Sequence, residues 1–335
     1  MINITYLIPV DSISGGVEVA VKNIRDISNN KYQFNIEYIF KDKSKVYSLS
    51  QLFNSIKKIV FIKPDVLIIS LWRSQVVGIF VKLFRPRTKL IFFIHSEADV
   101  HFVDFLSSRI ALFLSTEVWA DSITSLNQRF NYSKKIQNGR VVSFDSRIIE
   151  RLEIKSVEPK FIFWGRVGRE KAVTRSIIIF SKILKFYPKA TFKIIGSDGG
   201  QLGDVKKLCD DLKINHSVFF YNETIFSEIR QHAQESCFYL QTSLYEGAAM
   251  SVMESMKLGL VPIVTAVGEI SRYCNGDNAI IIKSNVEAVR DILMLLESKD
   301  SYYKLSDNAF KHWENQKSYK ESIIESCEGV LHDWF

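Results

Sequence analysis

The stretch CFYLQTSLYEGAAMSVMESMKLGLVPIVT, residues 237–265, holds one complete strand–helix–strand unit. Residues 237–241 and 261–265 are short runs bounded by turn residues, as buried strands are. Residues 248–258 between them predict a helix, which Gly259 can end in a left-handed conformation and Pro262 cannot continue. Because strands joined through a helix run parallel, the unit predicts a parallel sheet covered by helices.

The same alternation continues through the C-terminal half of the chain. Strands are expected at residues 161–164, 191–195, 218–221 and 279–282, and helices at residues 173–185, 202–212, 225–236 and 286–298. Residues 301–335 are expected to be helical and end in an aromatic-rich stretch. The pattern is that of a doubly wound α/β domain.

The N-terminal half shows a second series of the same kind. Strands are expected at residues 2–8, 34–40, 66–69, 89–94 and 117–120, and helices at residues 16–28, 48–61, 74–84 and 103–114. A less regular span follows, with a hinge near 150–158. We therefore expect an α/β protein with two doubly wound, Rossmann-like domains, residues 1–155 and 156–312, and a helical tail, 313–335, that packs back on the first domain. Ligands bind beyond the carboxyl ends of such strands, so a cleft between facing domains is the expected place for a site.

Length and composition are those of an ordinary globular protein. The chain has 335 residues, of which 47% are hydrophobic and 24% charged, which excludes general disorder. Its four cysteines form no C-x-x-C pair, so neither a disulfide framework nor a zinc site is expected, and a reducing cytoplasm fits best. The N-terminus lacks a basic region and a long apolar core, and no apolar run is long enough to span a membrane.

The positive charge lies in the first half of the chain. The net charge is +7, and residues 51–90 contain eight Lys and Arg against Asp65 alone. This indicates an anionic partner, namely nucleic acid, a membrane surface or a phosphorylated substrate, although a solvated basic face would look the same. Residues 81–87 mix cations with apolar side chains, as interfacial segments do.

Two glycine-containing loops each follow a predicted strand and precede a predicted helix. Gly15 and Gly16 would let the backbone approach a phosphate at a helix N-terminus, although this motif by itself favours a purely structural turn. In residues 164–171, Gly165 allows close approach while Arg166 and Lys171 place two cations at the end of a strand. The alternative for this loop is a solvated basic turn.

The third motif is the most specific. Glu246 follows a strand in a loop, and Glu254 lies about two turns into the next helix. The backbone N–H groups of Gly247, Ala249, Met250 and Ser251 could hold a diphosphate at the start of that helix. Glu254 could accept hydrogen bonds from the vicinal hydroxyls of a ribose; the alternative is an ordinary surface position. Its neighbours are apolar, and a buried glutamate needs a partner.

These motifs together resemble the retaining glycosyltransferases of family 4, which have the GT-B fold. The two glutamates are separated by seven residues, and the similarity spans nearly the whole chain in the expected order. The resemblance implies that Gly16 approaches the donor phosphates, that Arg166 and Lys171 bind the donor diphosphate, that Glu254 binds the ribose, and that Glu246 and His95 contact the transferred sugar. It also implies a metal-free reaction with retention of configuration, by front-side attack.

The chain departs from the family pattern at three places. Ala172 and Ala249 stand where glycine is usual, and residues 268–272 replace a more usual Gly-Gly-x-Pro-Glu. These departures bear on the geometry of the donor loops. No D-x-D element occurs, which agrees with the absence of a metal or any other cofactor.

The expected partners are a UDP- or GDP-linked sugar as donor, a glycan or polyprenyl-diphosphate-linked acceptor of surface polysaccharide (lipopolysaccharide or capsule) assembly, and the anionic inner face of the plasma membrane. The protein would thus be cytoplasmic and peripheral. Three alternatives stay open: a GT-B sugar-nucleotide 2-epimerase, a non-catalytic sugar-nucleotide or glycan-binding subunit, and a nucleic-acid binder. No recognisable nucleic-acid motif supports the last one.

Overall fold

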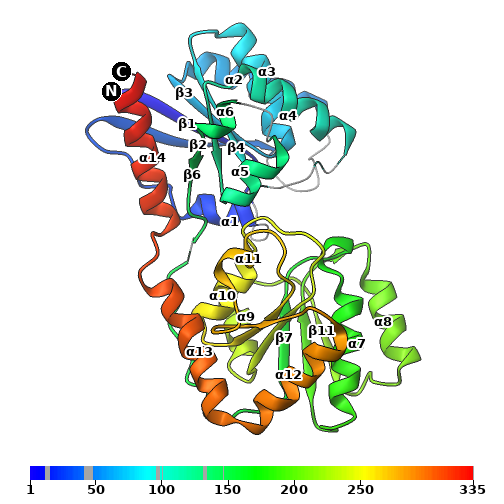
Figure 1. The fold of residues 1–335 in the computed structure, drawn as a ribbon. Coiled ribbons are helices and arrows are strands. Elements are labelled where there is room, and N and C mark those ends of the chain that lie inside the picture. Colours follow the sequence, from blue (N-terminus) through cyan, green and yellow to red (C-terminus); the bar gives the residue numbers. More distant parts are fainter. Residues whose placement is uncertain are drawn as a thin grey trace. The chain divides into compact units, whose positions relative to one another are not determined.

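The computed structural model describes residues 1–11, 16–40, 48–95, 99, 101–130, 134–145 and 147–334. The chain forms two compact units (Figure 1). Unit 1 contains residues 1–146 together with 317–335, and unit 2 contains residues 147–316. The division thus falls at residue 146, close to the irregular span of the sequence, and the last helix belongs to unit 1.

Unit 1 is built on a parallel six-stranded sheet in the order β2-β1-β3-β4-β5-β6. Its strands are β1 (Ile2–Val10), β2 (Tyr32–Phe40), β3 (Val66–Ser70), β4 (Lys89–Ile94), β5 (Glu117–Ala120) and β6 (Arg140–Val141). The strand β3 is buried along its whole length, as expected of a parallel strand with helices on both faces.

The helices of unit 1 are α1 (Gly16–Lys22), α2 (Leu49–Ile62), α3 (Leu71–Phe84), α4 (Phe102–Leu114), α5 (Ile123–Arg129), α6 (Lys134–Gln137) and α14 (Tyr319–Trp334). Helix α1 is shorter than the predicted 16–28. The chain leaves it through bonds from Asn23 N to Ala20 O and from Ile24 N to Val21 O, which tighten the last turn. Asn23 and Asp26 are residues that favour turns over helix, so the prediction of a longer helix was wrong.

The sheet of unit 1 buries apolar side chains against the helices of the unit. One face packs on α2, α3 and α4 through an apolar cluster that includes Leu67, Ile69, Val77, Leu90 and Leu112. The helix α14 belongs to the same unit: Tyr319 N donates to Asp145 O at 2.7 Å, and the Tyr319 ring lies 5.0 Å from that of Phe144.

Unit 2 has a second parallel six-stranded sheet, in the order β11-β9-β7-β12-β13-β14. Its strands are β7 (Lys160–Trp164), β9 (Thr191–Ile195), β11 (Val218–Tyr221), β12 (Phe238–Gln241), β13 (Val261–Val264) and β14 (Ile280–Ile281), and a small pair joins β8 (Val167–Gly168) to β10 (Asp198–Gly199). The helices are the 3-10 helix η2 (Arg169–Lys171), α7 (Val173–Leu184), α8 (Leu202–Asp211), α9 (Phe226–Ala233), α10 (Met250–Lys257), α11 (Ile270–Tyr273), α12 (Asn285–Glu297) and α13 (Lys299–Glu314).

These two sheets confirm the predicted fold class, two doubly wound α/β domains. The order of each sheet fixes where its loops can meet. In unit 2 the chain builds outward from β7 through β9 and β11, then starts again at β12 on the other side. The neighbouring strands β7 and β12 therefore form the switch point, where the loops that follow them part to opposite sides. Loops at this point are the preferred ligand position of such sheets.

In the described part of the chain, no helix is both long and apolar enough to cross a lipid bilayer.

The four cysteines provide a simple check of the fold. All are buried; burial raises the pKa of Cys209 to about 11, and it also raises the pKa of Cys237, Cys274 and Cys327. Because the thiolate is the reactive form, we expect the native protein to react with Ellman's reagent at pH 8 only slowly, and the denatured chain to react at all four cysteines. Fast reaction of the native protein would contradict this packing.

Candidate functional site

The switch point of unit 2 is lined by the loop that follows β7. After Trp164 the chain turns at Gly165, whose φ of 144° is unfavourable for residues with a side chain. The neighbouring strand β9 is followed by Gly196, where a Cβ would lie 1.9 Å from the carbonyl oxygen of Gly165. Only glycine fits there, so the two loops run in direct backbone contact.

Lys171 and Glu246 form an ion pair at this point. The Lys171 Nζ lies 2.6 Å from Glu246 Oε1, and the two side chains are only 16% and 8% exposed. Lys171 stands at the end of η2 and Glu246 in the loop after β12, where Leu244 N donates to Glu170 O. The structure thus brings together the predicted phosphate-binding cation and the predicted sugar-binding carboxylate, each neutralised by the other.

Glu246 is held by two further donors. Its Oε1 accepts hydrogen bonds from Gln241 Nε2 at 2.9 Å and from Ser243 Oγ at 2.6 Å. The amide of Gln241 is itself oriented, because its Oε1 accepts from Tyr239 and Ser251. Sequence analysis had no role for Gln241; a polar side chain ending a buried strand was the available signal. Ser251 serves here as a donor to Gln241.

Glu254 is buried, with 7% of the residue exposed, so the alternative of a surface position is wrong. Its Oε2 accepts a hydrogen bond of 2.8 Å from the indole N–H of Trp164, and its Oε1 pairs with the guanidinium of Arg147. These are the partners that a buried carboxylate needs. Sequence analysis missed both, since Arg147 lies 107 residues from Glu254 in the chain.

Arg166 is placed differently from Lys171. Its side chain is 64% exposed and pairs with Glu170, four residues on, at 2.6 Å. It therefore does not join the Lys171–Glu246 pair, and its binding of a diphosphate stays a prediction.

The helix α10 begins at Met250, slightly later than the sequence indicated. Ala249, directly before it, adopts a left-handed conformation with φ 53°, and Ala172, directly before α7, does the same with φ 45°. Both helices thus start from the backbone geometry that glycine favours. The carbonyl of Gly247 accepts from Glu269 N at 3.3 Å, which joins this loop to the residue before α11.

In unit 1, His95 follows β4, and its side chain is only 5% exposed. Its Nε2 lies 3.0 Å from Ser70 Oγ, which in turn lies 2.6 Å from Tyr6 OH, and its Nδ1 lies 3.5 Å from Asp121 Oδ2. Gly16 starts α1, while Gly15 lies outside the described residues. The roles of His95 and of the two glycines toward a donor sugar stay predictions.

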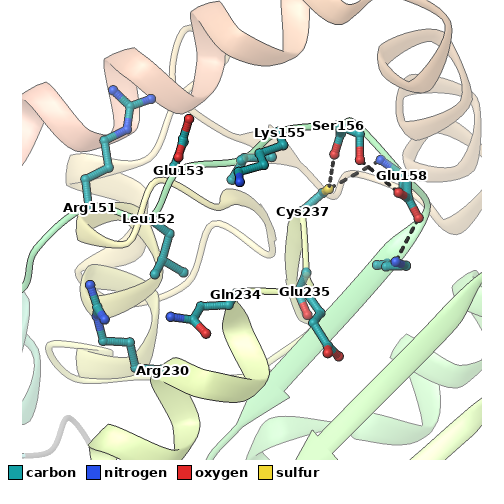
Figure 2. A pocket seen from close by; sticks show the side chains of 13 residues that line it. Arg151, Leu152, Glu153, Lys155, Ser156, Glu158, Arg230, Gln234, Glu235 and Cys237 are labelled. Carbon is teal, nitrogen blue, oxygen red and sulfur yellow. Dashed lines mark hydrogen bonds and ion pairs between the residues drawn. The ribbon is translucent and has the colours of Figure 1, made fainter.

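A cavity of about 470 Å³ in unit 2 lies away from these groups (Figure 2). It is lined by the start of β7 at Lys160 and by Cys237, just before β12, so it lies at the amino ends of the strands. Cys237 Sγ donates to Ser156 O, and Lys160 pairs with Glu158 at 2.8 Å. Its other cations include Arg151 and Arg230, which also pair with carboxylates, and we assign it no ligand.

Among the described residues, no group of three or more His, Cys, Asp or Glu side chains is arranged to hold a metal ion.

The sequence of the chain is similar to a known protein family and to one curated protein. The family model Glycosyl transferases group 1 matches residues 145–312, half of the chain, including the Lys171, Glu246 and Glu254 positions. A curated relative, alpha-monoglucosyldiacylglycerol synthase of Streptococcus pneumoniae, is 26% identical over 114 residues, which are 34% of this chain and 25% of the relative. The chain therefore matches only a quarter of that relative's length.

Solved structures share the fold at low identity. Anabaena HepE, solved with UDP-glucose, has a TM-score of 0.79 at 14% identity, over 99% of this chain and all of the other. S. aureus TarM, solved with UDP and alpha-GlcNAc-glycerol, has a TM-score of 0.70 at 16% identity, over 83% of this chain and 58% of the other. The sucrose-phosphate synthase of Thermosynechococcus elongatus has a TM-score of 0.76 at 13% identity, over 99% and 98%. These likenesses show the fold.

The two left-handed alanines predict a stabilising substitution. Replacing Ala172 with glycine should raise the free energy of unfolding by about 0.5–1 kcal/mol, because a Cβ is strained at positive φ. The matched control is Ala288→Gly at a buried position in the first turn of α12, which should lower the free energy of unfolding by about 1 kcal/mol. Urea denaturation of both variants gives the comparison. A loss of stability in Ala172→Gly would mean that the left-handed conformation is not adopted.

Proposed function

The chain belongs to the glycosyl transferases group 1 family and has the GT-B fold, and on this basis we propose that it is a retaining glycosyltransferase of family 4. In this proposal it moves a sugar from a nucleotide diphosphate sugar to a hydroxyl group of a lipid-linked glycan acceptor in surface-polysaccharide assembly. The observation that carries the proposal is the grouping of Lys171, Glu246 and Glu254 at the switch point of unit 2.

The chemistry requires stabilisation of a departing diphosphate. Negative charge grows on this leaving group in the transition state, and a fixed cation together with helix N–H groups stabilises it. Lys171 and the first N–H groups of α10, from Met250 on, are of this kind. A bound diphosphate would compete with Glu246 for Lys171, and Gln241 and Ser243 would keep the carboxylate of Glu246 in place for the sugar.

Glu254 and His95 are the residues proposed to contact the ribose and the transferred sugar of the donor. A buried carboxylate such as Glu254 can accept hydrogen bonds from two vicinal hydroxyls, as found on a ribose. His95 would contact the transferred sugar, and the leaving phosphate would take the acceptor's proton in a front-side attack that retains configuration. No metal or other cofactor is part of this proposal.

The donor is a UDP- or GDP-linked sugar, and the solved relatives favour UDP. Anabaena HepE was solved with UDP-glucose and S. aureus TarM with UDP. A lipid acceptor is favoured by the S. pneumoniae relative, which is named as a synthase of a glucosyldiacylglycerol.

A surface of unit 1 supports action at a membrane. The helices α2, α3 and α4 lie next to one another, with contacts from α2 to α3 and from α3 to α4, and their outer side carries large exposed apolar side chains. We call this the apolar face; its members are Leu49, Phe53, Phe61, Phe80, Leu83, Phe84, Phe102, Val103, Phe105, Leu106, Ile110 and Phe113. Exposed apolar side chains gathered on neighbouring helices are typical of interaction sites.

The charges on these helices favour an anionic lipid bilayer as the partner. Helices α2 and α3 contain no acidic residue, and the single one in α4, Asp104, is buried. Of the cations that the sequence suggested, Lys82 is used internally, since its Nζ donates to Pro86 O and Thr88 O, and Lys89 lies over the Trp334 ring. Arg87, three residues after Phe84 in the chain, stays exposed. The protein would thus bind the inner face of the plasma membrane peripherally.

Nucleotide binding tests the catalytic part of the proposal. UDP or GDP at a hundred times its Kd should stabilise the wild type by about 2.7 kcal/mol without added metal. Glu254→Gln and Lys171→Gln should each lose most of that shift, because each removes a charge that the ligand contacts. Thermal melting with and without nucleotide measures this, and the melting of each variant alone controls for folding. A shift that survives in both variants would contradict the site.

Vesicle binding tests the membrane part. Phe102→Gln and Phe113→Gln should together weaken sedimentation with phosphatidylglycerol vesicles by about a hundredfold, at roughly 1.4 kcal/mol lost for each exposed ring. The matched control is Phe186→Gln, an exposed phenylalanine of unit 2. Equal binding of all three proteins, or equal binding to phosphatidylcholine vesicles, would exclude this surface as an anionic membrane contact.

A further inference from the structure

Glu254 is held from both sides by residues with no assigned role. The indole N–H of Trp164 donates to Oε2 at 2.8 Å, and the guanidinium of Arg147 pairs with Oε1. With one donor fixed on each oxygen, the plane of the carboxylate cannot rotate freely.

Both of these residues are themselves fixed. Trp164 is 4% exposed, and its ring meets the buried Tyr239 ring edge to face at 4.5 Å. The Arg147 guanidinium lies 4.5 Å from the centre of the Phe226 ring. The carbonyl of Arg147 accepts a hydrogen bond from Lys257, which is one turn after Glu254 on α10. Arg147 is thus attached to this helix by its backbone and by its side chain.

We propose that Arg147 and Trp164 are positioning residues that aim the Glu254 carboxylate at the ribose, and that they thereby set the selection of ribonucleotide over deoxyribonucleotide donors. The inference rests on the proposed function. A ribose offers two hydroxyls at a fixed separation, and only a carboxylate held in one orientation accepts from both at good geometry. A carboxylate free to rotate would gain little from the second hydroxyl.

The diphosphate contacts are made by other side chains. The Trp164 ring is linked to them through Tyr239 and Gln241, and Trp164→Phe keeps an aromatic ring at that contact. Lys171, at the end of η2, pairs with Glu246 in the loop after β12, whereas Arg147 and Trp164 contact Glu254 on α10. Loss of Arg147 or Trp164 should therefore weaken the ribose contact and leave the phosphate contact in place. This separates a positioning role from a general loss of structure.

The test compares a nucleoside diphosphate with its 2′-deoxy form. The probe is whichever of UDP, GDP and ADP binds the wild type by calorimetry, and the variants are Trp164→Phe and Arg147→Met. Each should bind the ribonucleotide about tenfold more weakly, the value of one charge-assisted hydrogen bond, and the deoxynucleotide almost as well as the wild type does. The matched control is Arg151→Met, which removes an arginine of the same segment paired with Asp307. It should change neither affinity.

A second comparison tests the same inference if one of the single variants is unstable. In a Glu254→Gln background, adding Trp164→Phe should not lower ribonucleotide affinity further, because the group that it positions is gone. The inference is overturned by either of two results, provided that Glu254→Gln abolishes the preference for the ribonucleotide over the deoxynucleotide. One is that Trp164→Phe and Arg147→Met weaken the binding of both nucleotides equally, and the other is that they weaken the binding of neither. If the wild type binds none of the three nucleotides, the proposed function itself fails.

Discussion

The buried carboxylate of Glu254 imposes the main constraint on unit 2. A charge with so little contact to water has to be paired, and two distant parts of the chain supply its partners: the end of β7 through Trp164, and Arg147 at the start of the unit. The requirement ties the first residues of unit 2 and its central strand to one helix, α10. Packing and site geometry thus depend on the same group.

A second pair, Lys171 and Glu246, is an ion pair in which a bound diphosphate could replace Glu246 as the partner of Lys171. In the free protein the charges of the two side chains neutralise each other, and both side chains are largely shielded from solvent. A diphosphate brings its own negative charge to the lysine, while Gln241 and Ser243 hold the glutamate where it stands. Preorganised groups of this kind need little rearrangement during the reaction. Electrostatic stabilisation of the transition state is large for this reason.

Much of the fold could be predicted because buried parallel strands are continuous apolar runs: β4, β5, β9 and β11 have the predicted bounds. The glutamates stood out because loops after such strands form sites. Arg147 and Trp164 could not be predicted as partners of Glu254, since long-range pairing leaves no local spacing in the sequence, whereas Gln241 had a local signal as a polar residue that ends a buried strand. Helix α1 ended early at turn-forming residues, and Lys82 proved to be bonded to its own loop. The turn-forming residues after α1 are a local signal for its early end, whereas no local pattern indicates the hydrogen bonds of Lys82.

The most direct measurement of the central claim is a crystal structure of the protein with UDP, or with another nucleoside diphosphate that binds. We expect the two ribose hydroxyls to lie within hydrogen-bond distance of the Glu254 carboxylate, with Trp164 and Arg147 still in contact with it. The Lys171 Nζ should then lie against a phosphate oxygen. A nucleotide bound elsewhere, or with its ribose turned away from Glu254, would contradict the account.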